Sequence, residues 1–155
     1  MGSPVLESPS GNLAESLKGS WWLLTREDWT HEGEKRIDPV LGPDPVGILT
    51  YSGTHFAAQF MKRDRENNPA ESFSYSGSNN TVAVGGYDAY FGTYEVNEEA
   101  GAVLHTLLGS ITPANIGISV SRDMRADDQK LVIQLATTRP DGEPIIRTLT
   151  WKRLG

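Results

Sequence analysis

Short apolar or alternating segments recur along this 155-residue chain, and turn residues separate them. This pattern is typical of an antiparallel β-sandwich or barrel, because its strands bury one face and reverse at Gly, Pro, Asn and Asp. We expect strands at Ser20–Arg26, Gly47–Tyr51, Thr54–Met61, Ser72–Tyr75, Ala89–Val96, Ala102–Gly109, Gly117–Arg125, Lys130–Thr137 and Ile145–Arg153. The turn residues between them are Ser52-Gly53, Asn97–Gly101, Ala126–Gln129 and Pro140-Asp141-Gly142. Successive strands should therefore form hairpins.

The number of strands favours closure of the sheet. About eight sequential antiparallel strands leave two open edges, and closing the sheet into a barrel removes them. We therefore predict an all-β fold, an up-and-down antiparallel barrel of about eight strands, whose interior holds side chains or one small ligand. The barrel domain should span residues 13–155, after a flexible N-terminal tail of small and polar residues at 1–12.

Helix signals are sparse. A short N-terminal helix is expected at Asn12–Lys18, where Asn12 can cap and Glu15 stands three positions later, as in a capping box. A second helical turn is expected within Asn79–Tyr87. The polar segments Thr30–Val46 and Lys62–Ala70 are expected to be long loops, and such loops tend to be mouths or lids.

Charge and composition exclude several classes of function. The net charge is -6, which argues against a nucleic-acid partner, since such proteins cluster Lys and Arg against phosphates. The chain has no cysteine, so thiolate nucleophiles and zinc–thiolate sites are excluded. No apolar run approaches the ~20 residues that a membrane helix needs, so no membrane partner is expected. The start of the chain lacks a signal-peptide pattern, and we expect a cytoplasmic protein, a monomer or a homodimer.

Motifs for cofactors and metals are also missing. No Gly-rich phosphate loop precedes a helix, and there is no Gly-x-Ser-x-Gly elbow. The histidines at 31, 55 and 105 are too scattered to suggest a metal site by spacing. We therefore expect neither a cofactor nor a metal ion.

Polar residues share the inward faces of several strands. Side chains alternate across a strand, and His105 shares its face with Val103 and Leu107. By the same argument Tyr90 and Tyr94, then Arg122 and Met124, and then Arg147 and Trp151 are predicted to point inward. If the hairpin pairs as expected, His105 lies beside Tyr94. Buried Arg is costly unless paired, and the sequence offers few inward carboxylates, so an anionic or carbonyl-bearing ligand would supply a partner.

Two ends of the chain carry a family resemblance. Gly19-Ser20-Trp21 opens the first strand and Trp151-Lys152-Arg153 closes the last. Between them stand Pro45–Tyr51, Tyr90–Val96 (YFGTYEV), His105, Pro113 and Arg122, in that order. The ordered set resembles the lipocalin-like domain family of small microbial and fungal proteins over roughly residues 16–154. The resemblance implies a lipocalin-type barrel in which Trp21 packs against Arg153.

Three hypotheses of function follow. In the first, the protein is an isomerase or cyclase that needs no cofactor, such as a pericyclase or dehydratase. It would act on a small, largely hydrophobic oxygenated metabolite of secondary metabolism, a role that the resemblance permits. In the second, the barrel only binds or carries such a molecule. In the third, it is a structural or interaction domain with a filled core.

The candidate site is the same in the first two hypotheses. His105 titrates near neutrality unless perturbed, and Tyr94 or Arg122 can hydrogen-bond an enolate oxygen, so these three are the catalytic candidates. The ligand-binding candidates are Tyr90, Arg147, Phe56, Phe60, Trp151 and Met124. A histidine inside a strand is as readily a hydrogen-bonded core residue, and the sequence leaves both interpretations open. Loop residues predicted to lie near the mouth are Trp29, His31 and His55.

Overall fold

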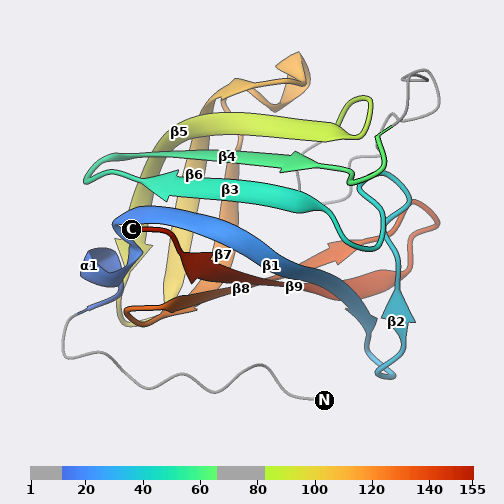
Figure 1. Ribbon diagram of the computed structural model, residues 1–155, viewed down its shortest axis with the longest axis horizontal. Coiled ribbons are helices and arrows are strands. Elements are labelled where there is room, and N and C mark those ends of the chain that lie inside the picture. Colours follow the sequence, from blue (N-terminus) through green and yellow to red (C-terminus); the bar gives the residue numbers. More distant parts are fainter. Residues whose placement is uncertain (1–11, 66–82) are drawn as a thin grey trace.

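The computed structural model describes residues 12–65 and 83–155, which form one antiparallel sheet closed into a barrel (Figure 1). The elements, in chain order, are α1 (Leu13–Leu17), β1 (Gly19–Thr30), β2 (Lys35–Arg36), β3 (Val46–Tyr51), β4 (His55–Met61), β5 (Tyr87–Asn97), β6 (Ala102–Ser110), the 3-10 turn η2 (Pro113–Asn115), β7 (Ser119–Ala126), β8 (Lys130–Thr138) and β9 (Pro144–Arg153). Successive strands from β3 to β9 pair in order, and β1 pairs with both β3 and β9. The predicted eight-stranded barrel is therefore confirmed, with β2 as a short extension of the β1 edge.

Two sequence predictions differ from the structure within the described residues. Residues 83–87 are not a helical turn but a tight reversal, in which Val84 and Tyr87 form an antiparallel bridge. Gly85 and Gly86 make the reversal with φ of 60° and 75°, a conformation that glycine adopts without steric cost. Strand β2 was not predicted. The strand expected at Ser72–Tyr75 and the rest of the expected helical turn, at 79–82, lie outside the described residues.

Strand β1 is longer than predicted and changes its inward face midway. Its register with β9 shifts between Leu23 and Thr25, which marks a β-bulge. A bulge adds one residue to one strand, so the alternation of faces moves by one position beyond it. Trp21 and Leu23 point into the core before the bulge, whereas Asp28 and Thr30 are the buried residues after it. The bulge thus turns even-numbered polar residues into the barrel.

The end of the barrel near α1 is sealed. The Asn12 side chain accepts a hydrogen bond from the Glu15 amide at 2.9 Å, as the sequence predicted for the helix cap. Leu17 is fully buried, and its carbonyl accepts a hydrogen bond from the Trp21 indole at 2.9 Å. The Arg153 guanidinium lies 4.1 Å from the Trp21 ring centre, which confirms the pair expected from the resemblance.

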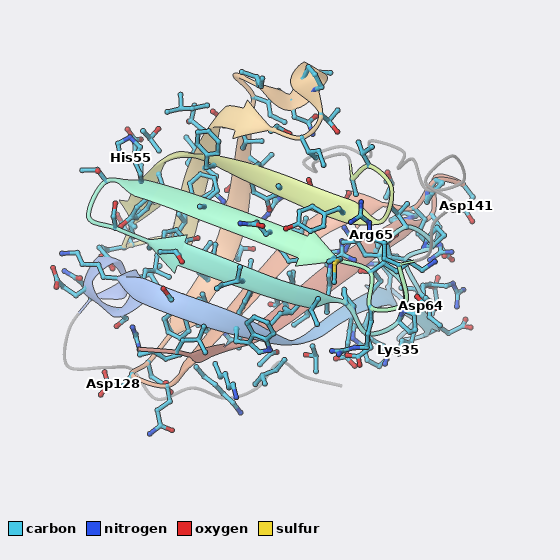
Figure 2. The ribbon with its side chains drawn as sticks, turned by 45° about the horizontal axis from the view of Figure 1, so that its top comes forward. Lys35, His55, Asp64, Arg65, Asp128 and Asp141 are labelled. Carbon is cyan, nitrogen blue, oxygen red and sulfur yellow. The ribbon has the colours of Figure 1, made fainter. Side chains whose placement is uncertain are left out.

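The opposite end of the barrel is the mouth. It carries the connection from β2 to β3, residues 37–45, and the turn from β8 to β9 (Figure 1). Figure 2 labels four charged residues at this end: Lys35, Asp64, Arg65 and Asp141. His55 was predicted to lie near the mouth, but it stands in the β3–β4 hairpin at the sealed end (Figure 2). None of the described helices is long and apolar enough to cross a membrane.

Candidate functional site

A cavity of about 40 Å³ lies inside the barrel. Six titratable side chains line it: Arg26, Asp88, Tyr90, His105, Arg122 and Arg147. The remaining lining is apolar or aromatic: Leu41, Leu49, Ala58, Phe60, Ile133, Leu135, Leu149 and Trp151. A mostly apolar wall with a few convergent polar groups is the usual composition of a small-molecule site.

His105 is buried at the cavity wall and forms a hydrogen bond with Tyr51, which was not among the site residues predicted from the sequence. Its Nε2 lies 2.6 Å from the Tyr51 hydroxyl, and its ring stacks on Phe56 with 4.0 Å between ring centres. Burial and, to a smaller extent, the nearby positive charge of Arg122 together lower the pKa of His105 to about 3. Burial also holds the pKa of Tyr51 well above its usual value. Both rings are therefore neutral at pH 7.

Two of the interior arginines are paired with carboxylates. Arg147 donates to both oxygens of Asp28, at 2.7 and 3.1 Å, and both side chains are buried. Arg26 donates to Asp38 at 2.8 Å, and Arg147 approaches the same Asp38 oxygen at 3.6 Å. Burial alone would raise the pKa of Asp38, but Arg26 and Arg147 outweigh it and lower the pKa to about 2. Asp38 thus stays ionised between two guanidinium groups.

The expectation of few inward carboxylates is therefore wrong. Asp28 and Asp88 are 3% and 5% exposed, and Asp38 reaches in from the connection between β2 and β3. Asp28 was missed because the sequence prediction ended β1 at Arg26, and because the bulge shifts the inward face. Asp38 was missed because its loop carries no periodic signal. Pairing of Asp28 with Arg147 across β1 and β9 would have been a usable signal once that register was known.

The remaining polar lining comes from three strands. Arg122 is 6% exposed and donates to the Ser121 carbonyl at 2.9 Å, and burial lowers its pKa. Burial and the neighbouring Asp88 raise the pKa of Tyr90 to about 12. The Trp151 indole Nε1 is buried and has no hydrogen-bond acceptor among residues 12–65 and 83–155. An indole N–H buried in this way normally has an acceptor, so Trp151 is a lining residue with an unpaired donor.

The structure gathers six of the nine predicted site residues at the cavity: His105, Arg122, Tyr90, Arg147, Phe60 and Trp151. Three predicted residues do not line it. Tyr94 pairs with His105 across β5 and β6, as expected, but its hydroxyl donates to the Ser52 carbonyl at the sealed end. Phe56 supports the His105 ring from behind. Met124 is buried with its sulfur 3.8 Å from the Tyr51 hydroxyl.

Metal ligands do not cluster in the part of the chain that the structure describes. No group of three His, Asp or Glu side chains there is placed to hold a metal ion. The polar groups at the cavity are instead mainly hydrogen-bond donors: three guanidinium groups, a phenol and an indole. Such a set suits oxygen acceptors on an organic molecule.

The comparison with known families gives one match. A family model described as a lipocalin-like domain matches residues 18–154, which is nearly the whole chain. None of the curated proteins compared with the chain matches it.

Proposed function

The chain belongs to the lipocalin-like domain family, and we propose from this premise that its barrel is a cup for a small, largely hydrophobic organic molecule with an oxygen acceptor. The observation that carries the proposal is the Trp151 indole, a buried donor without an acceptor among the described residues, at a cavity that Trp151 itself lines. Leaving such a donor unpaired costs about 1–3 kcal/mol. A ligand oxygen would remove that cost.

The composition of the cavity supports the same ligand class. The lining has an apolar part, which includes Leu49, Ile133 and Leu149, and a polar part, which includes Arg122 and Tyr90. An entirely apolar ligand would make no use of the polar lining, and a highly polar one would lose its water without compensation. A molecule with an apolar body and an oxygenated end fits both parts.

A larger side chain in the cavity tests whether the ligand binds there. Ala58 is 2% exposed and lines the cavity, whereas its neighbour Ala57 points to the outer face of β4. Ala58→Val places two methyl groups in the cavity, and such overpacking costs about 1–3 kcal/mol, which leaves the fold measurable. Ala57→Val is the matched control, because it adds the same atoms to the same strand outside the barrel.

The measurement is native mass spectrometry and thermal shift of the three proteins with an organic extract of the natural source. We predict that the wild type and Ala57→Val retain a small molecule and melt at a higher temperature with the extract, while Ala58→Val does neither. Equal retention by Ala58→Val and Ala57→Val would place the binding outside the barrel. No retention by any of them would favour the filled-barrel hypothesis.

A second candidate function is catalysis by the same cup, as a cofactor-independent isomerase or cyclase of such a metabolite. The favouring observation is that three chemically different groups, His105, Arg122 and Tyr90, line one cavity. Since the pKa of His105 is about 3, its neutral imidazole is a weak base. The geometry therefore favours a template that folds the substrate, with Arg122 stabilising a developing oxyanion, over proton abstraction by His105. Recovery of the retained molecule in altered form, during the same incubation, supports catalysis.

A further inference from the structure

One described segment that lines the cavity lies outside the sheet. Every described residue that lines the cavity lies on a strand except Leu41, which belongs to the connection at residues 37–45. Leu41 is 3% exposed and packs into the core cluster. Moving a strand residue outward would break ladder hydrogen bonds, whereas this connection can swing away with few of them lost.

The size of the cavity requires such a movement. Its volume is about 40 Å³, while a benzene-sized guest takes a cavity of about 150 Å³ in a well-studied protein interior. Leu41 is the lining residue whose withdrawal would enlarge the cavity with the strands in place.

An internal ion pair latches this segment. Asp38 lies in it, at 2.8 Å from Arg26 and 3.6 Å from Arg147. The Asp38 side chain also accepts the Val40 amide at 2.9 Å, which ties its carboxylate to the segment. The carboxylate and Leu41 therefore leave the barrel together.

Opening leaves the two arginines in different states. Arg147 keeps its two hydrogen bonds to Asp28. For Arg26, Asp38 is the ion-pair partner among the described residues, and the Arg26 side chain is 9% exposed. An open barrel thus presents a buried guanidinium that has lost its carboxylate, and such a charge is unfavourable until another anion takes that place.

We infer that the cup takes a small organic carboxylate, whose carboxyl group replaces Asp38 on Arg26 when the 37–45 segment opens. This inference rests on the proposed cup and adds the chemical class of the ligand. The apolar body of the ligand occupies the space that Leu41 vacates, beside Phe60, and a further oxygen of the ligand accepts the Trp151 indole N–H. Asp38 acts as an internal competitor that keeps the empty barrel closed.

The first test compares benzoate with benzamide, its neutral isostere, by isothermal titration calorimetry. We expect the wild type to bind benzoate at least about tenfold more tightly, and Arg26→Gln to lose that preference, because a desolvated charge pair distinguishes the two probes. Equal affinities of the wild type for benzoate and benzamide would overturn the carboxylate inference.

The second test concerns the latch. Asp38→Asn should tighten benzoate binding by about tenfold, because a larger share of the protein is open before binding. Asp44→Asn is the matched control: Asp44 lies in the same segment, and its ion pair with Arg63 is exposed. We expect its affinity to stay within about twofold of the wild type. If Asp38→Asn bound benzoate no more tightly than Asp44→Asn, the replacement of Asp38 by the ligand carboxylate would be overturned.

A measurement on the wild type avoids any loss of folding in the variants. Saturation with benzoate should expose the Leu41 methyl groups to a soluble paramagnetic relaxation agent, and unchanged relaxation would overturn the lid. Failure of the inference and failure of the cup are distinguishable. If both probes bind equally and Ala58→Val abolishes both, the cup stands and the carboxylate class falls. If neither probe binds but the wild type and Ala57→Val retain a molecule from the extract that Ala58→Val does not, the carboxylate class also falls and the cup stands. The cup falls only when retention from the extract fails.

Discussion

At the scale of single residues, burial of His105 makes stability depend on pH. The folded-state pKa of His105 is about 3, below its ordinary value of 6.5. Between these two values the unfolded chain binds a proton that the folded protein excludes, so the free energy of unfolding decreases as the pH falls. This contribution is fully present above about pH 6.5, and it is lost progressively towards pH 3.

We predict that His105→Gln removes this dependence. One proton taken up on unfolding changes the free energy of unfolding by about 1.4 kcal/mol per pH unit. Urea denaturation between pH 4.5 and 6 measures how the free energy of unfolding changes with pH, above the pH range in which most carboxylates titrate. The wild type should show this slope and His105→Gln should not.

Tyr51→Phe is the control for the hydrogen bond. It removes the hydroxyl that lies 2.6 Å from His105 Nε2 but keeps the ring that helps to bury His105. Because burial is the main cause of the low pKa of His105, the pH slope should remain. Stability at pH 7 should fall by about 1 kcal/mol for the lost hydrogen bond. An unchanged slope in His105→Gln would contradict the assignment of the proton to His105.

The sequence predicted correctly which of these side chains point into the barrel, but it did not predict the residues that hydrogen-bond them. Alternation alone placed His105, Arg122 and Arg147 inside, because each shares a face with apolar neighbours. Tyr51 and Asp28, which hydrogen-bond two of them, are 54 and 119 residues away in sequence. Contacts across a barrel depend on strand register and shear, and periodicity in one segment carries no such information.

At the scale of elements, the junction of α1 with β9 holds the sealed end together. Arg153 donates to the carbonyls of Lys18 and Asp128, at 2.7 and 2.6 Å, while its guanidinium faces the Trp21 ring. One planar side chain thereby joins the segment after α1, the β7–β8 turn and the barrel wall. This arrangement needs several donors in a fixed plane, which lysine lacks.

We predict that Arg153→Lys lowers the free energy of unfolding by about 2 kcal/mol, because the charge remains while the hydrogen bonds to separate carbonyls are lost. The neighbouring Lys152 is exposed on the outer face of β9, so Lys152→Gln is the control and should change stability by less than about 0.5 kcal/mol. Guanidinium denaturation of both variants measures the difference. Equal stability of Arg153→Lys and Lys152→Gln would show that the junction contributes little.

Element boundaries show where sequence reasoning stops. The turns at Ser52-Gly53 and Pro140-Asp141-Gly142 were identified because their residues favour reversals, and the structure places them between β3 and β4 and between β8 and β9. The bulge in β1 has no such signature in Leu23–Thr25. It arises where β1 bends to serve two neighbours, β3 and β9, and this tertiary requirement decides which side of Arg26 and Asp28 faces inward.

At the scale of the whole molecule, the barrel has one sealed and one latched end. Helix α1 and Arg153 close one end, and the 37–45 segment covers the other through Asp38 and Leu41. The closed barrel was predictable because a long series of hairpins leaves edges that closure removes. The volume of its cavity was not, because it depends on how Leu41, Phe60 and Trp151 pack together.

The Trp151 indole tests the central claim most directly, by ¹H–¹⁵N correlation of the tryptophan side chains during titration with the source extract. The Trp21 indole is the internal control, because it already donates to the Leu17 carbonyl. We predict that the Trp151 Nε1–H signal shifts downfield to saturation as a ligand oxygen accepts its hydrogen bond, while the Trp21 signal stays in place. A stationary Trp151 signal, with shifts confined to the outward-facing Trp22, would contradict the cup.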